Sequence, residues 1–285
     1  MSETPKLETV AISQQGKVAV VSLNRPEKAN AMNWQMWQDI RSAMQWADRT
    51  PEVRAVVLQG EGKHFTSGID LTMMMGLQGQ IKDDCDGRMR EKLRQLILEL
   101  QDTLTSLERC RKPVLAAIHN GCVGGGVDLI SCADMRYASA DAYFTIKEID
   151  IGMVADVGTL QRLPKLLPMA LVKELAYTGR RLPADKALTW GLVNDVLPTH
   201  EACVAAALQA AKEIASKPPV AMWGTKQVLH YARDHSVDEG LKQMGWLQGA
   251  IWSNANVREA ITAMQERREP HFAPLAPLKG FREFG

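Results

Sequence analysis

The order of the apolar segments constrains the fold of this chain more strongly than any other feature of its sequence. A short apolar run at Val18–Leu23, a helical pattern that begins after Asn33 and a second apolar run at Arg54–Gln59 follow one another directly. This strand–helix–strand order implies a crossover α/β unit. We therefore predict an α/β fold.

The character of the chain changes at about residue 158. Before that point, further strands are predicted at Pro113–Ile118, Met135–Ala138 and Tyr143–Ile146. Residues 76–88 are rich in Gly and Asp, and we expect a loop there before a helix whose apolar residues run from Leu93 to Leu107. Beyond residue 158 only Leu192–Val196 is predicted to be extended, and helices are expected at 160–166, 170–177, 201–216, 220–231, 237–249 and 257–267. The pattern predicts an α/β core followed by a helical region.

Composition and charge exclude several classes of function. The 285 residues include 34 Lys and Arg against 33 Asp and Glu, a net charge of +1. This balance gives no electrostatic argument for a nucleic acid or a membrane surface, so an anionic ligand would need a local basic cluster. The five cysteines form no Cys-x-x-Cys pair and no His/Cys cluster has zinc spacing, so we expect no metal site.

The ends of the sequence carry no targeting pattern that we can identify. Met1–Val10 is polar and acidic, without the apolar centre of a signal peptide or the Arg-rich pattern of a transit peptide. Arg282–Gly285 differs from the peroxisomal Ser-Lys-Leu signal. No apolar run approaches the ~20 residues that span a membrane. These features predict a soluble cytoplasmic protein with no membrane partner.

Two turns that contain glycine follow predicted strands and can offer backbone N–H groups to a ligand. His64–Asp70 contains Gly68, which lets the backbone turn tightly. In Gly121–Asp128, the run Gly124–Gly126 precedes a helix, and the first N–H groups of a helix suit an anion or a developing oxyanion. The spacing does not fit a G-x-G-x-x-G dinucleotide loop. Both turns are also compatible with a purely structural role.

A third segment, Lys147–Leu163, places acids among apolar residues. A carboxylate in such surroundings loses hydration, which raises its pKa toward the range useful for proton transfer. Glu148 and Asp156 are the candidates, because two carboxylates on opposite sides of a cleft can pass protons between different carbons of one substrate. Alternatively, Asp156 is the N-cap of a helix that starts near Gly158. Asp150 is expected to point outward.

In this order and spacing, the three segments resemble the crotonase (enoyl-CoA hydratase/isomerase) superfamily. The landmarks are Asn24–Pro26, Ser67–Asp70, Gly124–Gly126 and Gly158–Leu163, and the match runs from about Val18 to Phe272. The resemblance implies a crotonase-type spiral of repeated strand–strand–helix turns in residues 1–200. It implies a helical region in residues 201–285 that forms trimers, usually paired as a hexamer. It also implies an acyl-CoA substrate, with CoA as part of the substrate and no separate cofactor.

The same resemblance assigns residues to the binding of that substrate. The backbone N–H groups of Ile69 and Gly125 carry over as the two donors of an oxyanion hole for the thioester carbonyl. Independently of the resemblance, Arg25 and Lys28 form a local basic cluster and are candidates for the CoA phosphates, with a solvated turn as the alternative. Ser67, Gly68, Asp70 and Gly124 are also expected to bind the substrate.

The acids resemble one branch of the superfamily. Hydratases carry Glu where this chain has Asp128 and Glu148, and usually Gly where it has Asp156. The three acids together look like the branch that isomerises 3,5-dienoyl-CoA to 2,4-dienoyl-CoA, which moves a proton off carbon 2 and another onto carbon 6. The hypothesis is that Asp156 is the base at carbon 2, Glu148 the acid at carbon 6, and Asp128 a residue that tunes or orients the pair. The two main roles can also be reversed.

Two other functions compete with this hypothesis. One is enoyl-CoA hydration or another crotonase reaction such as thioester hydrolysis, although Asp156 argues against plain hydration. The other is a non-catalytic crotonase-fold protein that serves as a binding or RNA-contacting scaffold. We rank it lower because the acids and both glycine turns are present and the net charge is only +1. We therefore expect an isomerase of unsaturated fatty acid β-oxidation that forms a homo-oligomer, a trimer or a hexamer, with no nucleic-acid partner.

Overall fold

A computed structural model describes residues 3–278 of the chain. Within these residues, β1 is antiparallel to β2 and the later neighbours are parallel. The six strands of this sheet are, in spatial order, β1 (Val10–Gln15), β2 (Val18–Leu23), β3 (Ala55–Gly60), β4 (Val114–Ile118), β6 (Met135–Ser139) and β9 (Asp195–Leu197). A smaller sheet of the same region joins β5 (Gly121–Val123), β7 (Tyr143–Thr145) and β8 (Leu182–Pro183).

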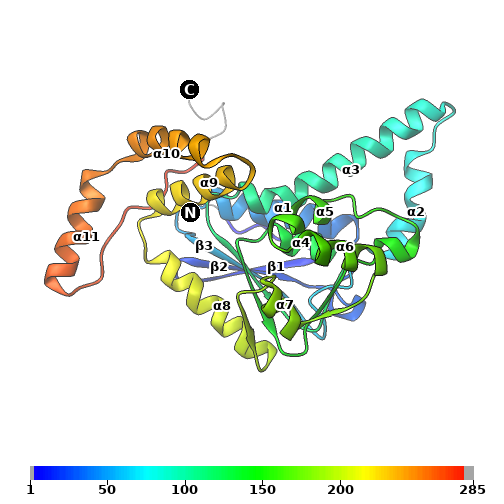
Figure 1. Cartoon of the computed structure of the whole chain (residues 1–285), viewed down its shortest axis with the longest axis horizontal. Coiled ribbons are helices and arrows are strands. Elements are labelled where there is room, and N and C mark those ends of the chain that lie inside the picture. Colours follow the sequence, from blue (N-terminus) through cyan, green and yellow to red (C-terminus); the bar gives the residue numbers. More distant parts are fainter. Residues whose placement is uncertain (1–2, 279–285) are drawn as a thin grey trace.

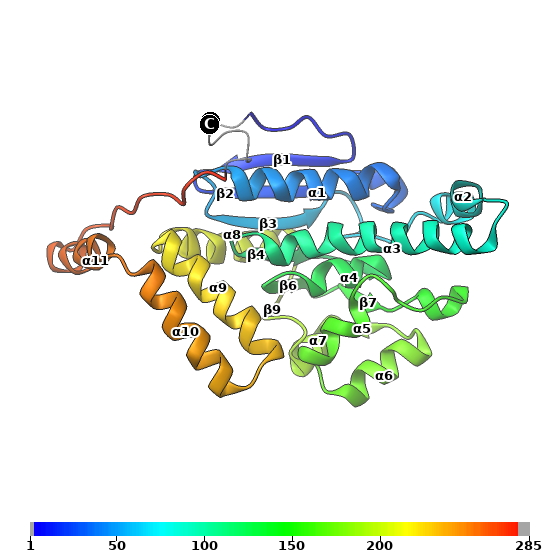
Figure 2. The ribbon, with the colours of Figure 1, turned by 90° about the horizontal axis from the view of Figure 1, so that it is seen from above.

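The helices cover both faces of the large sheet. Those of the first half are α1 (Trp34–Arg49), α2 (Leu71–Ile81), α3 (Asp86–Arg109) and α4 (Gly125–Ser131), with the short helices η1 (Pro26–Lys28) and η2 (Glu148–Ile151). Those that follow are α5 (Thr159–Arg162), η3 (Leu163–Lys165), α6 (Met169–Thr178), α7 (Ala184–Trp190), α8 (His200–Ala215), α9 (Pro219–Asp234), α10 (Val237–Ile251) and α11 (Asn254–Glu266). Helices α1 and α3 lie on one side of the sheet and α8 on the other (Figures 1 and 2).

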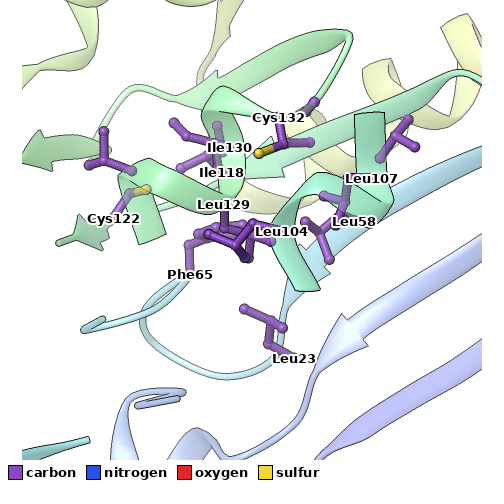
Figure 3. Packing of buried hydrophobic residues seen from close by; sticks show 14 of the residues in the cluster. Leu23, Leu58, Phe65, Leu104, Leu107, Ile118, Cys122, Leu129, Ile130 and Cys132 are labelled. Carbon is purple, nitrogen blue, oxygen red and sulfur yellow. The ribbon is translucent and has the colours of Figure 1, made fainter. Parts of the chain in front are cut away.

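The core has two layers because alternate residues of each strand point to opposite faces. The layer against α8 contains Val18, Ala55, Val57, Leu115, Ala117, Ala207 and Ala211. The larger layer, under α1, α3 and α4, includes Leu23, Leu58, Phe65, Leu104 and Leu129, which are packed together in Figure 3. Phe65 is fully buried and comes just before the first glycine turn, so the larger layer anchors that turn.

Helix α1 forms as the sequence predicts. The side chain of Asn33 accepts a hydrogen bond from the Met36 N–H (3.0 Å) and caps the helix. Its buried face includes Met36, Ile40 and Met44, which are spaced at about one helical turn.

The predicted loop at residues 76–88 is wrong over most of its length. Helix α2 runs to Ile81 and α3 begins at Asp86. Asp70 caps α2 by accepting the Thr72 N–H (2.9 Å), and Leu, Met and Gln are good helix formers that offset its two glycines. The sequence analysis also did not predict β1 and α7.

The C-terminal helices begin against the sheet and end away from it. Helix α8 packs on the face of the central strands, whereas α10 and α11 project from the body of the molecule (Figure 1). These two helices and the link between them expose large apolar side chains, among them Leu241 and Trp246 of α10, Trp252 of the link and Met264 of α11. The division at residue 200 and the oligomerisation region stay predictions. Among the described helices, none is long and apolar enough to cross a membrane.

Candidate active site

A cavity of about 850 Å³ lies between α2, α3 and the loops that follow β3 and β5. One wall is apolar and consists of Met73, Met74, Leu77, Leu93, Leu96, Ile97 and Leu100. The polar groups that reach the cavity come from the segment between β2 and α1, from the two glycine turns, from η2 and from the loop before α5. An apolar cavity with a few converging polar groups is the usual form of a small-molecule site.

The first turn is shaped by Gly68, whose φ of +87° favours glycine. A Cβ atom there would lie 2.6 Å from the Val123 carbonyl oxygen, so glycine also lets this turn approach the second one. Met32 donates its N–H to the Gly68 carbonyl and accepts the Asp70 N–H. Because these bonds lie on one side of the strand, the N–H of Ile69 points to the other side.

The second turn brings a further N–H to the same place. Gly125 is the first residue of α4, and a Cβ atom on it would lie 3.8 Å from the Ile69 nitrogen. Across the described residues, neither the Ile69 N–H nor the Gly125 N–H donates a backbone hydrogen bond. Both residues line the cavity. The two predicted oxyanion donors are therefore neighbours with their N–H groups available to a ligand.

Glu148 opens η2 beside the second turn. A Cβ atom on Gly124 would lie 2.9 Å from Glu148 Oε1, so this carboxylate lies directly against the second turn, where a φ of +51° favours glycine. Its Oε2 is buried without a hydrogen-bond partner in the part of the chain that the structure describes. Burial, together with the nearby charge of Asp128, raises the pKa of Glu148 to about 7. As expected, Asp150 on the same turn is exposed, and it pairs with Lys147.

Asp156 reaches the cavity from the loop between η2 and α5. Burial raises the pKa of its half-buried carboxyl group above the ordinary value. Its backbone carbonyl accepts a hydrogen bond from Gln101 Nε2 of α3 (2.6 Å). The N-cap residue of α5 is Gly158, so the alternative of Asp156 as the N-cap is wrong.

Asp128 lies one turn inside α4 and is fully buried. It is not among the described residues that line the cavity. Its Oδ1 accepts the Thr159 N–H (2.6 Å), and burial raises its pKa to about 6. This hydrogen bond ties α4, which carries Gly125, to the segment that carries Asp156. The tuning role of Asp128 stays a prediction.

The predicted substrate-binding side chains lie at the cavity as well. Arg25 Nη1 donates to Asp70 Oδ2 (3.0 Å), so this pair fixes the end of the first turn. Lys28 and Ser67 are exposed and line the cavity with Gly68 and Gly124. Of the two predicted phosphate-binding cations, Lys28 is exposed, whereas Arg25 is partly buried and paired with Asp70.

Sequence reasoning missed two residues that hold the site together. Asn30 is fully buried, with its amide donating to the Glu61 and His64 carbonyls (2.8 and 2.9 Å) and its φ at +52°. The signal was an Asn between Ala residues, because Asn tolerates this conformation better than most side chains. Gln101 carried no signal, since its partner lies 55 residues away in the sequence.

Solved structures identify the fold. The enoyl-CoA hydratase from Bacillus anthracis superposes with a TM-score of 0.83 at 27% identity, over 93% of this chain and 99% of the other. The family model described as enoyl-CoA hydratase/isomerase matches residues 13–274. The chain therefore belongs to the enoyl-CoA hydratase/isomerase family, and the predicted crotonase-type α/β fold is confirmed.

Two curated relatives are more similar in sequence. The mouse (Mus musculus) protein named Delta(3,5)-Delta(2,4)-dienoyl-CoA isomerase, mitochondrial, is 46% identical over 258 residues, which are 90% of this chain and 79% of the relative. The Arabidopsis thaliana protein named Delta(3,5)-Delta(2,4)-dienoyl-CoA isomerase, peroxisomal, is 40% identical over 276 residues, 96% of this chain and 99% of the relative.

The names of these relatives correct one expectation. The sequence analysis predicted a cytoplasmic protein from the absence of targeting patterns, but the relatives are named as mitochondrial and peroxisomal. The cytoplasmic prediction is therefore wrong. Targeting signals are short and variable, so failing to identify one in a sequence is weak evidence for a compartment.

Proposed function

We propose that this protein isomerises 3,5-dienoyl-CoA to 2,4-dienoyl-CoA in the degradation of unsaturated fatty acids. The observation that carries the proposal is that Glu148 and Asp156 line one cavity from two different segments, together with the available N–H groups of Ile69 and Gly125. The names of both curated relatives support the same reaction.

The proposed reaction removes a proton from carbon 2 of the acyl chain and adds a proton to carbon 6. Asp156, as the carboxylate, takes a proton from carbon 2, and the electron pair moves into the thioester to give a dienolate. The N–H groups of Ile69 and Gly125 stabilise the negative oxygen of this dienolate. Glu148, as the neutral acid, gives a proton to carbon 6, which moves the double bonds to carbons 2 and 4. Exchange with water then restores both carboxyl groups.

The burial of Asp128 away from the cavity favours isomerisation over hydration. Hydration needs two acids close together to hold one water near carbons 2 and 3. Asp128 stands where hydratases carry the first of those acids, but it is fully buried and engaged by the Thr159 N–H. Of the three acids Asp128, Glu148 and Asp156, the last two are then the ones that line the cavity in the described structure.

A spectrophotometric assay tests the proposal directly. The purified protein is incubated with 3,5-dienoyl-CoA without added metal or cofactor, and we expect rapid growth of the absorbance of a 2,4-diene conjugated with the thioester. A hydratase would instead remove the conjugated absorbance of a 2-enoyl-CoA and leave the 3,5-diene unchanged. Inactivity on both substrates, with salt-dependent binding of RNA, would support the binding-protein alternative.

The pH dependence of kcat is expected to be bell-shaped. Asp156 must be ionised, so activity should rise as the pH passes its raised pKa. Glu148 must be protonated, so activity should fall above its pKa of about 7. Steady-state rates from about pH 4, near the ordinary pKa of an aspartic acid, to about pH 9 measure both limbs. A flat profile from pH 6 to 9 would contradict the role of Glu148 as the acid.

Removing one oxyanion donor tests the role of Gly125. Gly125→Pro deletes the N–H at the first position of α4, where helices tolerate proline. We expect kcat to fall by about 10²–10³-fold, as for the loss of one donor in other oxyanion holes. Gly125→Ala is the matched control, because it adds the same Cβ near Met32 but keeps the N–H. Equal activity of the two variants would exclude this donor.

We also propose that the helical region, residues 201–285, assembles the protein into a trimer or a hexamer. The support is the exposure of Leu241, Trp246 and Met264 on α10 and α11, since such apolar side chains usually mark an interface. Light scattering on the purified protein gives the mass in solution. Trp246→Glu is expected to shift that mass toward one chain of 31.5 kDa.

A further inference from the structure

Helix α3 holds the segment that carries Asp156 at two points. Gln101 Nε2 donates to the Asp156 carbonyl oxygen (2.6 Å). Two turns further along α3, Glu108 accepts from Arg162 of α5 (2.9 Å), and Thr105 accepts from the same guanidinium (3.1 Å). These contacts join residues that are more than 50 positions apart in the sequence, so tertiary packing alone creates them.

The contact from Gln101 is the one that reaches the loop itself. Within residues 3–278, residues 152–158 receive one hydrogen bond from outside the segment 148–162, and Gln101 is its donor. The Arg162 contacts hold the helix that follows the loop. Without Gln101, the backbone of Asp156 would lose its direct attachment to the rest of the fold.

The same stretch of α3 also shapes the cavity. Leu100, next to Gln101, lines it together with Leu96 and Ile97 one turn earlier. The helix that forms the apolar wall thus fixes the acid that faces this wall. Helix α3 alone therefore sets the distance between the apolar wall and Asp156.

We propose that Gln101 is a positioning residue for Asp156, which holds this carboxylate at the carbon from which it takes a proton. The inference rests on the proposed function, in which Asp156 is the base. A displacement of about 1 Å in a reacting group can cost about 10²-fold in rate, so one hydrogen bond to the backbone of the base has a large effect on kcat.

The position of the loop at residues 152–158 also affects the pKa of the Asp156 carboxyl group. Burial is the main cause of the raised pKa of Asp156, and its charge interacts with those of Glu148 and Asp128. A loop released from Gln101 admits water to the carboxylate. Hydration then lowers the pKa of Asp156 toward its ordinary value.

The test uses Gln101→Met, which keeps the length of the side chain and removes the amide donor. We expect kcat to fall about 10- to 100-fold, with a smaller change in KM, and the acidic limb of the pH profile to move to lower pH. Gln209→Met on α8 is the matched control, because Gln209 is exposed and its amide contacts only Glu213 among the described residues. It should leave both readouts unchanged.

A second substitution separates this inference from the proposed function. In an Asp156→Asn background, Gln101→Met should add no further loss, because Gln101 acts through Asp156. If Asp156→Asn alone keeps wild-type activity, the proposed function fails, whatever Gln101→Met does. If Asp156→Asn is impaired while Gln101→Met keeps the kcat and acidic limb of the wild type, the positioning role is wrong. Gln101→Asn, which keeps an amide that is too short, replaces Gln101→Met if that variant does not fold.

Discussion

Asp156→Asn is expected to lower kcat for the isomerisation of 3,5-dienoyl-CoA by about 10²–10⁴-fold, the usual contribution of general acid–base catalysis. Asparagine keeps the shape of the side chain and leaves the backbone carbonyl bonded to Gln101. Its amide cannot accept the proton from carbon 2. The rate of formation of the conjugated 2,4-diene at saturating substrate measures the effect.

The control for this prediction is Asp150→Asn. Asp150 loses the same charge six residues away, but it is exposed, pairs with Lys147 and is not among the described residues that line the cavity. We expect this variant to keep the activity of the wild type. An Asp156→Asn protein that isomerises at the wild-type rate would remove the argument for Asp156 as the base.

Glu148→Gln is expected to reduce isomerisation by a similar factor, about 10²–10⁴-fold, for a different reason. The variant keeps Asp156 and both oxyanion donors, so it should still form the dienolate. The step that fails is the delivery of a proton to carbon 6. Glu91→Gln, at an exposed site on α3, is a control that neutralises a glutamate away from the cavity.

Hydrogen exchange distinguishes the two acids. When the reaction runs in deuterated water, Glu148→Gln should still exchange the hydrogens at carbon 2 of 3,5-dienoyl-CoA while it makes little 2,4-diene. Asp156→Asn should lose both activities. The opposite pattern, exchange retained by Asp156→Asn and lost by Glu148→Gln, would show that the two roles are reversed. Mass spectrometry of the recovered 3,5-dienoyl-CoA measures how much deuterium has been incorporated at carbon 2.

The parts of the site that local chemistry dictates were predictable from the sequence. Gly68 and Gly124 are needed where φ is positive and the two turns approach each other closely, and glycine is visible in a sequence. The placement of Glu148 and Asp156 among apolar neighbours likewise indicated raised pKa values, and the structure gives that direction for both.

The parts that depend on distant contacts were not predictable. The sequence places Asp128 with the other acids, and only the packing of α4 shows that it lies behind the cavity wall. The helix at Leu71–Ile81 contradicts its glycine-rich composition because Asp70 caps it and Arg25 holds Asp70 in place. Gln101 reaches the Asp156 backbone only after the chain has folded.

The hydrogen bond between Asp128 and the Thr159 N–H has a consequence for protein engineering. It crosses from the helix that presents the Gly125 N–H to the segment that follows Asp156. The Asp128 carboxylate therefore braces the end of the loop that follows Asp156 against α4, while Gln101 holds the Asp156 backbone itself. A graft of Asp156 alone into a hydratase would bring the reactive group without this brace. Under the proposed function, a transplant between scaffolds would therefore have to carry Asp156 together with Asp128, Gln101 and the loop that these two residues hold.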